Sequence, residues 1–375
     1  MKSKTFRHWI FLLHRYLGLA VGFVIVLVGL TGSLLVFQPE FEQWSLQQKI
    51  GTVIPQSQRI SAESAIDAVK EAYQNKGFTP FFVGLPDHAD QPYDISLENQ
   101  AGDRAHAYVN PYTGKVMWLQ EQSNSFFDLV RTFHYSLLAD EPGRQFIGVI
   151  AFLMMLLSIS GTLLWSGWRK LITGFKIKLD AHPKRVNYDV HKVAGIVAAV
   201  FLFFTAITGF CWNFWDYTVP AIYALTLTPQ QPTFVSQPLP GKTSLSLSEI
   251  LLKADAALPK ATTTYIRIPK ASEEVFEIGK KLPQETDEYG DSSVTFDQYT
   301  GQVLQVRNAL KLPLGDRIVN GMTPLHYGTF GGLPTRILYV FVGVAPLILF
   351  ITAFVMWRYR KRPMTSLLTQ ANAQK

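Results

Sequence analysis

The chain has 375 residues, a formal net charge of +7 at pH 7 and one cysteine. Its basic residues flank long uncharged runs and do not form a patch with stacking aromatics, which argues against nucleic-acid binding. The single cysteine, Cys211, excludes an internal disulfide and any zinc or iron–sulfur site built from cysteine ligands.

Four uncharged runs are each long enough for an α-helix to cross a bilayer. A hydrocarbon core of about 30 Å needs roughly 20 helical residues at about 1.5 Å per residue. The runs cover residues 17–37, 145–168, 193–215 and 337–357. The first run is longer than the apolar region of a signal peptide and lacks a small-residue cleavage site, so we expect it to remain as a helix.

The basic residues predict the orientation of these spans. Lysine and arginine gather before the first span, between the second and third, and after the fourth, so these parts are expected in the cytoplasm of a bacterium, inside its inner membrane. The predicted parts are residues 1–37 (cytoplasmic N-terminus and first transmembrane helix), 38–143 (first periplasmic domain), 144–168 (second helix), 169–190 (basic cytoplasmic loop), 191–215 (third helix), 216–335 (second periplasmic domain), 336–357 (fourth helix) and 358–375 (cytoplasmic tail).

Each long outer segment predicts a small α+β domain. A serine cap begins a helix at Ser61 in the first segment and at Ser246 in the second. Strand-like runs bounded by turn residues follow each helix. They cover residues 80–85, 93–97, 105–110 and 115–119 in the first segment, and 264–268, 274–278, 293–297 and 302–306 in the second. We expect each domain to pack one helix on an antiparallel sheet.

Identical or similar residues recur at equal spacing in the two halves of the chain. The first set pairs His14 with His191, Thr31 with Thr208 and Gly32 with Gly209; the second pairs His134 with His326, Arg144 with Arg336 and Trp165 with Trp357. The sequence therefore predicts a tandem repeat of a two-helix unit. Two helices return the chain to its starting side, so the halves should be related by a pseudo-two-fold axis along the membrane normal.

This symmetry predicts two facing pairs of histidines, His14 with His191 and His134 with His326. A lone histidine is more often a structural residue, but four in symmetric register near a membrane favour a functional site. Two imidazoles on opposite faces of one porphyrin fill both axial positions, and such a haem passes single electrons without binding oxygen. We expect His134 and His326 to lie in the interfacial layer, on short helices such as residues 125–138.

Residues near the histidines have two interpretations that the sequence leaves open. Small and apolar residues on the histidine face of two spans would serve either helix packing or a flat macrocycle; they are Gly18, Gly22, Ile25 and Gly29 in the first span, and Gly195, Ala199, Leu202 and Ala206 in the third. Four basic residues could balance haem propionates or bind lipid phosphates; they are Arg15, Lys192, Arg144 and Arg336. The other histidines, His8, His88, His106 and His182, are expected to be structural or exposed.

Several motifs together carry a family resemblance. They are His14-Arg-Tyr-Leu-Gly-Leu, Leu30-Thr-Gly-Ser, Asn110-Pro-Tyr-Thr-Gly-Lys, Phe133-His-Tyr-Ser-Leu, His191-Lys-Val-Ala-Gly and Leu325-His-Tyr-Gly. With them the sequence resembles the PepSY-associated transmembrane family over nearly its whole length, and within it the inner-membrane ferrisiderophore reductases. The resemblance implies two b-type haems that reduce siderophore-bound iron(III) in the periplasm, and outer domains of the PepSY type.

Transmembrane electron transfer to a ferric siderophore is therefore the leading hypothesis. No flavin or nicotinamide signature is present, so a separate donor, a quinol or a cytoplasmic reductase, is expected. One alternative is a regulatory module whose PepSY domains bind a periplasmic partner and whose histidines are structural. Another is a transporter whose histidines bind copper or zinc, although such ligands would be expected near the midplane of the bilayer. The sequence assigns no catalytic residue.

Overall fold

The computed structural model describes residues 2–73, 76–121, 125–285 and 289–361, which form two compact units. The membrane unit consists of Met1–Gln38, Leu129–Ile222 and Gly321–Lys375, and the sheet unit of Pro39–Asp128 and Tyr223–Asn320. Most of the predicted cytoplasmic tail, residues 362–375, lies outside the described residues.

Four helices of the described chain are long and apolar enough to cross a membrane, as predicted. They are α1 (Lys2–Leu35), α5 (Asp140–Leu164), α7 (Pro183–Asn213) and α11 (Leu333–Lys361). Each begins before the predicted run, because hydropathy marks only the uncharged centre of a helix that continues through charged ends. His14 and His191 consequently lie within α1 and α7, and not at the first residues of these helices.

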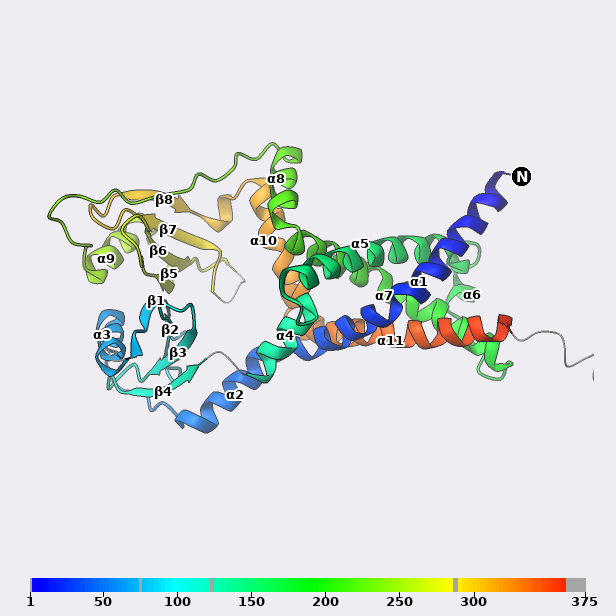
Figure 1. Cartoon of the computed structure of the whole chain (residues 1–375), viewed down its shortest axis with the longest axis horizontal. Coiled ribbons are helices and arrows are strands. Elements are labelled where there is room, and N and C mark those ends of the chain that lie inside the picture. Colours follow the sequence, from blue (N-terminus) through cyan, green and yellow to red (C-terminus); the bar gives the residue numbers. More distant parts are fainter. Residues whose placement is uncertain (1, 74–75, 122–124, 286–288, 362–375) are drawn as a thin grey trace, which may run out of the picture. The chain divides into compact units, whose positions relative to one another are not determined.

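The four long helices form one bundle (Figure 1). Helix α1 packs against α5 and α11, and α7 packs against the same two helices, so α1 and α7 lie diagonally opposite each other. The α1–α11 contact is close: Ser33 Oγ donates to the carbonyl oxygen of Val340 at 2.9 Å, and Gly29 faces Gly343. Part of the small-residue stripe of α1 therefore serves helix packing.

Replacing Gly343 with valine is expected to destabilise the membrane unit by about 1–3 kcal/mol, the usual cost of overpacking. A Cβ atom at Gly343 would lie 2.2 Å from Ser33 Oγ and 2.5 Å from the carbonyl oxygen of Gly29. Thermal unfolding of the purified protein in detergent, followed by circular dichroism, measures the change. Gly321→Val is the control, since a Cβ atom at Gly321 meets nothing within 4 Å. An unchanged Gly343→Val protein would contradict this packing.

Shorter helices connect the long ones. Helices α4 (Phe126–Ser136) and α10 (Leu314–Tyr327) precede α5 and α11, and a 3-10 helix (Thr329–Gly331) follows α10. A 3-10 helix (Ser166–Trp168) and α6 (Leu171–Phe175) join α5 to α7, and α8 (Trp215–Leu225) follows α7. Helix α2 (Gln38–Ile50) continues from α1.

The sheet unit contains a single antiparallel sheet of eight described strands, ordered β4-β3-β2-β1-β5-β6-β7-β8. The strands are β1 (Thr79–Gly84), β2 (Tyr93–Glu98), β3 (Arg104–Val109), β4 (Val116–Glu121), β5 (Thr262–Arg267), β6 (Phe276–Lys281), β7 (Ser292–Phe296) and β8 (Val303–Arg307). A 3-10 helix (Ala309–Lys311) follows β8. The strand positions agree with the prediction, but the expectation of two separate sheets is wrong.

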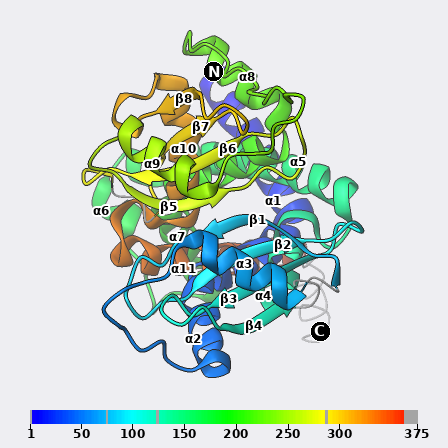
Figure 2. The same ribbon diagram turned by 90° about the vertical axis from the view of Figure 1, so that its left-hand side faces the viewer.

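The two halves of the sheet join where β1 pairs with β5, with Val83 opposite Ile266. Pairing of these edges satisfies backbone groups that two separate sheets would leave exposed. Helices α3 (Ala62–Tyr73) and α9 (Leu247–Ala257) lie on the same face of the sheet (Figures 1 and 2), and their apolar sides share one core with both halves. Ser246 caps α9 with a full capping box, as predicted.

Candidate functional site

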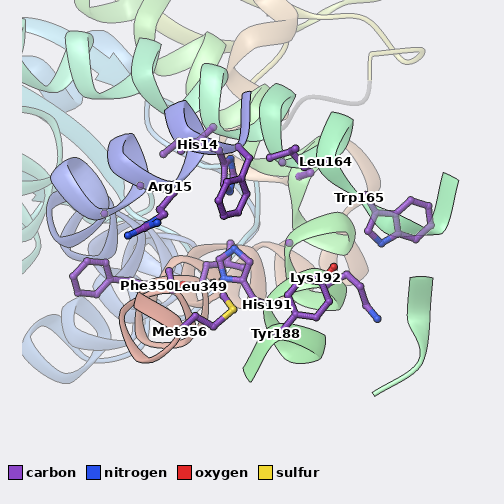
Figure 3. A pocket seen from close by; sticks show the side chains of 18 of the residues that line it. His14, Arg15, Leu164, Trp165, Tyr188, His191, Lys192, Leu349, Phe350 and Met356 are labelled. Carbon is purple, nitrogen blue, oxygen red and sulfur yellow. Dashed lines mark hydrogen bonds between the residues drawn. The ribbon is translucent and has the colours of Figure 1, made fainter. Parts of the chain in front are cut away.

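The structure brings His14 of α1 and His191 of α7 together across the bundle. Their ring centroids lie 6.3 Å apart, and the ring planes are nearly perpendicular at 86°. Figure 3 shows the two rings in one pocket, with Arg15 on one side of the pair and Trp165 on the other. We call His14 and His191 the inner pair.

His134 of α4 and His326 of α10 form an outer pair of nearly the same geometry. Their ring centroids are 6.2 Å apart and their planes meet at 84°. Both residues precede the helices that are long enough to span a membrane, in agreement with the predicted placement on short helices. Trp212 of α7 packs on the His326 ring, with centroids 4.7 Å apart.

These separations fit a metal held between two imidazoles. The ring centres would be about 6.4 Å apart, with about 2.0 Å for each metal–nitrogen bond and about 1.2 Å from nitrogen to ring centre. Direct edge-to-face contact of two rings also gives centres about 4.5–7 Å apart, so distance alone does not assign a ligand role. The hydrogen bonds of the rings are a second observation.

Every one of the four histidines places Nδ1 beside a hydroxyl oxygen of a different helix, at 2.7–3.0 Å. Each hydroxyl donates its single proton to the carbonyl oxygen four residues earlier in its own helix, at 2.6–2.9 Å. The pairs are His14 with Ser160, His191 with Thr352, His134 with Thr31, and His326 with Thr208.

The hydroxyl proton is therefore already donated to a carbonyl oxygen, and the hydroxyl oxygen accepts from Nδ1–H of the imidazole. A neutral imidazole carries one proton, so this places the free lone pair on Nε2 of all four rings. Metal-ligating histidines have this arrangement, in which the second ring nitrogen donates to a fixed acceptor and so sets the tautomer and the ring orientation. The hydrogen bonds make each ring a ready ligand.

The outer pair is also neutral at physiological pH. Burial lowers the pKa of His134 to about 4, and burial together with the neighbouring His134 lowers the pKa of His326 to about 3. A metal binds the unprotonated imidazole, so a lowered pKa keeps both rings in the state that a ligand needs.

A cavity of about 970 Å³ surrounds the inner pair. Four small residues of the predicted stripes line it, namely Gly18, Gly22, Gly195 and Ala199, whereas Gly29 packs against α11. Gly22 fits both interpretations of the stripes, because it lines the cavity and a Cβ atom there would lie 2.6 Å from the Phe350 ring of α11. The other three leave open space beside His14 and His191. The volume lies in the range of pockets that hold drug-sized ligands and cofactors, about 300–1,000 Å³.

Arg15 and Lys192, the basic neighbours of the inner pair, differ in the structure. Both line the cavity, and Arg15 Nε is buried without a hydrogen-bond partner among the described residues. Lys192 Nζ instead donates to the Asp189 carboxylate and to the carbonyl oxygens of Thr173 and Lys176, each at 3.0 Å. Its three protons are therefore donated to Asp189 of its own helix and to Thr173 and Lys176 in and after α6, and a role of Lys192 beside a haem propionate stays a prediction.

Arg144 lies near the start of α5 and Arg336 near the start of α11, and each has a partner in the protein. Arg144 Nε lies 2.9 Å from the Glu141 carboxylate in a half-exposed ion pair. Arg336 Nη2 donates to the carbonyl oxygen of Val36 at 2.6 Å, and its guanidinium lies over the Phe37 ring. A role of either arginine beside a haem stays a prediction.

Sequence reasoning missed the hydroxyl partners. Thr31 and Thr208 belong to the identified repeat, but no role was assigned to them. Ser160 and Thr352 lie equally far past His134 and His326, a signal that the spacing already contained. Three glycines leave room for the rings: a Cβ atom would lie 3.0–3.4 Å from the Cε1 atom of a histidine at Gly32, Gly161 and Gly209.

The remaining histidines occupy other places. His106 Nδ1 lies 2.9 Å from the Asp94 carboxylate, which raises its pKa, and His88 is exposed. His182 caps α7 by accepting from the backbone N–H of Lys184. His8 and His182 also line the inner cavity, which the sequence did not predict.

A family model described as the PepSY-associated TM region matches residues 11–360, a stretch that includes both histidine pairs. The chain belongs to the PepSY-associated transmembrane family. With its four long apolar helices, this family member is a membrane protein. No curated protein matches the chain.

The number of histidines in each pair of this PepSY-associated protein bears on which kind of metal group they could hold. Each pair supplies two imidazoles, and the described residues contain no group of three or more His, Cys, Asp or Glu side chains that could hold a metal ion. A protein-bound zinc ion takes about four ligands. Two imidazoles are the complete axial set of a haem iron, so the residues present fit a haem better than a bare ion.

Proposed function

We propose that this protein carries single electrons across the bacterial inner membrane and reduces siderophore-bound iron(III) in the periplasm. Two facing histidine pairs, with each Nδ1 beside a hydroxyl oxygen, are the observation on which the proposal depends. His14 and His191 would hold one b-type haem through Nε2, and His134 and His326 a second. A haem with both axial positions filled supplies one-electron transfer when bound.

The protein's own residues prepare each site for such a group. Ser160, Thr352, Thr31 and Thr208 hold the rings in position and keep Nε2 unprotonated. Gly18, Gly22, Gly195 and Ala199 leave space beside the inner pair. The buried, unpaired Nε of Arg15 is available for a propionate.

We further propose a duplicated chain with both termini in the cytoplasm and the sheet unit in the periplasm. A span, two short helices, four strands, another short helix and a second span follow one another twice along the chain, from α1 to α5 and from α7 to α11. Equivalent hydroxyls bind equivalent histidines in the two halves. The concentration of Lys and Arg at one set of span ends supports this orientation.

The substrate proposal combines the motif resemblance to ferrisiderophore reductases with coordination chemistry. Hard oxygen chelators hold iron(II) more weakly than iron(III), so one electron per iron releases the metal for uptake. The chain has no flavin or nicotinamide signature, and a separate donor supplies the electrons.

The purified protein is expected to bind two haems per chain. A reduced-minus-oxidised absorption spectrum with haem quantitation tests this, and a colourless protein would refute the proposal. Substrate is tested with dithionite-reduced protein in liposomes, a ferric siderophore and a chelator that traps iron(II). The gallium(III) form of the same siderophore is the control, because it competes for binding and cannot be reduced in this way.

A further inference from the structure

The inner cavity extends past His14 towards the start of α1. Its lining includes Phe11, His8 and Arg7, which lie up to about 10 Å from His14 along the helix at about 1.5 Å per residue. Residues near the end of α5, the start of α7 and the end of α11 complete this region. We define the inner chamber by Phe11, Trp165, Tyr188, Met356 and Trp357.

One polar group in the inner chamber has no partner. Trp165 is 7% exposed, and its indole Nε1–H has no hydrogen-bond partner among the described residues. A buried indole N–H is nearly always bonded, since leaving a polar group dry and unpaired costs free energy. An acceptor atom of a ligand in the chamber would satisfy it.

The cations near Trp165 have partners in the protein. Lys192 and Arg185 both bind the buried Asp189 carboxylate, each at 3.0 Å, and Arg7 Nη2 donates to the carbonyl oxygen of Leu164 at 2.7 Å. Arg15 also lines the cavity, has a buried guanidinium nitrogen without a hydrogen-bond partner among the described residues, and lies on the other side of the histidine pair (Figure 3). A haem propionate would find its counter-charge at Arg15, which would leave the Trp165 N–H for an oxygen of a second ligand.

The other residues of the chamber suit a flat apolar ring. Phe11, Tyr188, Met356 and Trp357 provide aromatic faces and a thioether, and all lie at the ends of membrane-spanning helices, where a lipid-soluble molecule can arrive from the bilayer. We propose that the inner chamber binds a membrane quinol, whose oxygen accepts the Trp165 hydrogen bond, as the electron donor. This inference rests on the proposed function and names its donor.

The overall reaction balances with the substrates already named. One quinol loses two electrons and the protons of its two O–H groups and becomes a quinone, while two ferric chelates each gain one electron. His8 lines the same end of the cavity, is exposed to solvent, and can accept a released proton.

Trp165→Phe keeps an aromatic ring and removes the N–H donor. With a short-chain benzoquinol and the oxidised holoprotein, its rate of reduction below saturation is expected to fall roughly tenfold, as for one lost hydrogen bond. Haem content and reduction by dithionite should not change. Trp168→Phe is the matched control, because the Trp168 indole already donates to the carbonyl oxygen of Thr162 at 2.6 Å.

A second readout does not depend on haem or activity. A photoreactive azidoquinone is expected to label the wild-type protein at chamber residues, with less labelling of Trp165→Phe. Two haems and reduction of ferric chelates without quinol oxidation or labelling would overturn this inference and leave the proposed function intact. Trp165→Phe that loses haem but oxidises quinol normally would assign the indole to a propionate and also overturn it. A protein without haem would refute the proposed function, and labelling would still decide the quinol site.

Discussion

His14→Ala protein is expected to bind one haem per chain where the wild type binds two, and His134→Ala should do the same for the other site. Each variant removes one of the two histidines of one pair and leaves the other pair unchanged, since the inner and outer pairs share no residue. Haem quantitation per chain, with absorption spectra of the reduced protein, measures the loss.

The control for this experiment is His182→Asn. His182 lines the same cavity as His14 but caps α7, and asparagine is a good helix cap, so two haems should remain. Retention of two haems by His14→Ala would show that His14 is not a ligand. Loss of both haems from every single histidine variant would instead indicate that the histidines maintain the fold.

The spans and the histidine pairs could be predicted because their signals are strong in the sequence alone. A run of about 20 uncharged residues is typical of a transmembrane helix and rare in any other structure. Equal spacing in two halves gave the pairing of His14 with His191 and of His134 with His326, and the ring centroids show these pairs. Equal spacing of motifs thus predicted a long-range contact that hydropathy cannot predict.

Other features depend on contacts that no local pattern contains. The pairing of β1 with β5 joins strands from distant segments, and either strand would look the same as an edge of a separate sheet. Lys192 directly follows His191 in the sequence. Only the fold shows that its ammonium group donates to Asp189, Thr173 and Lys176. The spacing relates Ser160 to Thr352, but only the fold shows that Ser160 lies beside His14.

A second large effect is expected when the Thr208 hydroxyl is removed. Thr208→Val keeps the shape of the side chain and removes the acceptor of His326 Nδ1–H, which lies 2.7 Å from the Thr208 oxygen. The His326 ring would then depend on the backbone carbonyl of Thr205 as its acceptor. Loss of a side-chain partner of this kind weakens metal binding roughly 10–100-fold. The outer haem is therefore expected to dissociate far more readily, while the inner haem is retained.

Transfer of haem to excess apomyoglobin, followed by absorption, measures the loss rate of each haem. Thr208→Ser keeps the hydroxyl and should restore retention, which distinguishes a hydrogen bond from simple packing. Thr205→Val is the matched control, because the Thr205 hydroxyl, one turn earlier on α7, donates to the carbonyl oxygen of Leu202. Equal haem loss from Thr208→Val and Thr205→Val would mean that the hydroxyl does not orient His326. The carbonyl oxygen of Thr205, which also accepts a hydrogen bond from the His326 ring, would then be sufficient to fix the proton on Nδ1.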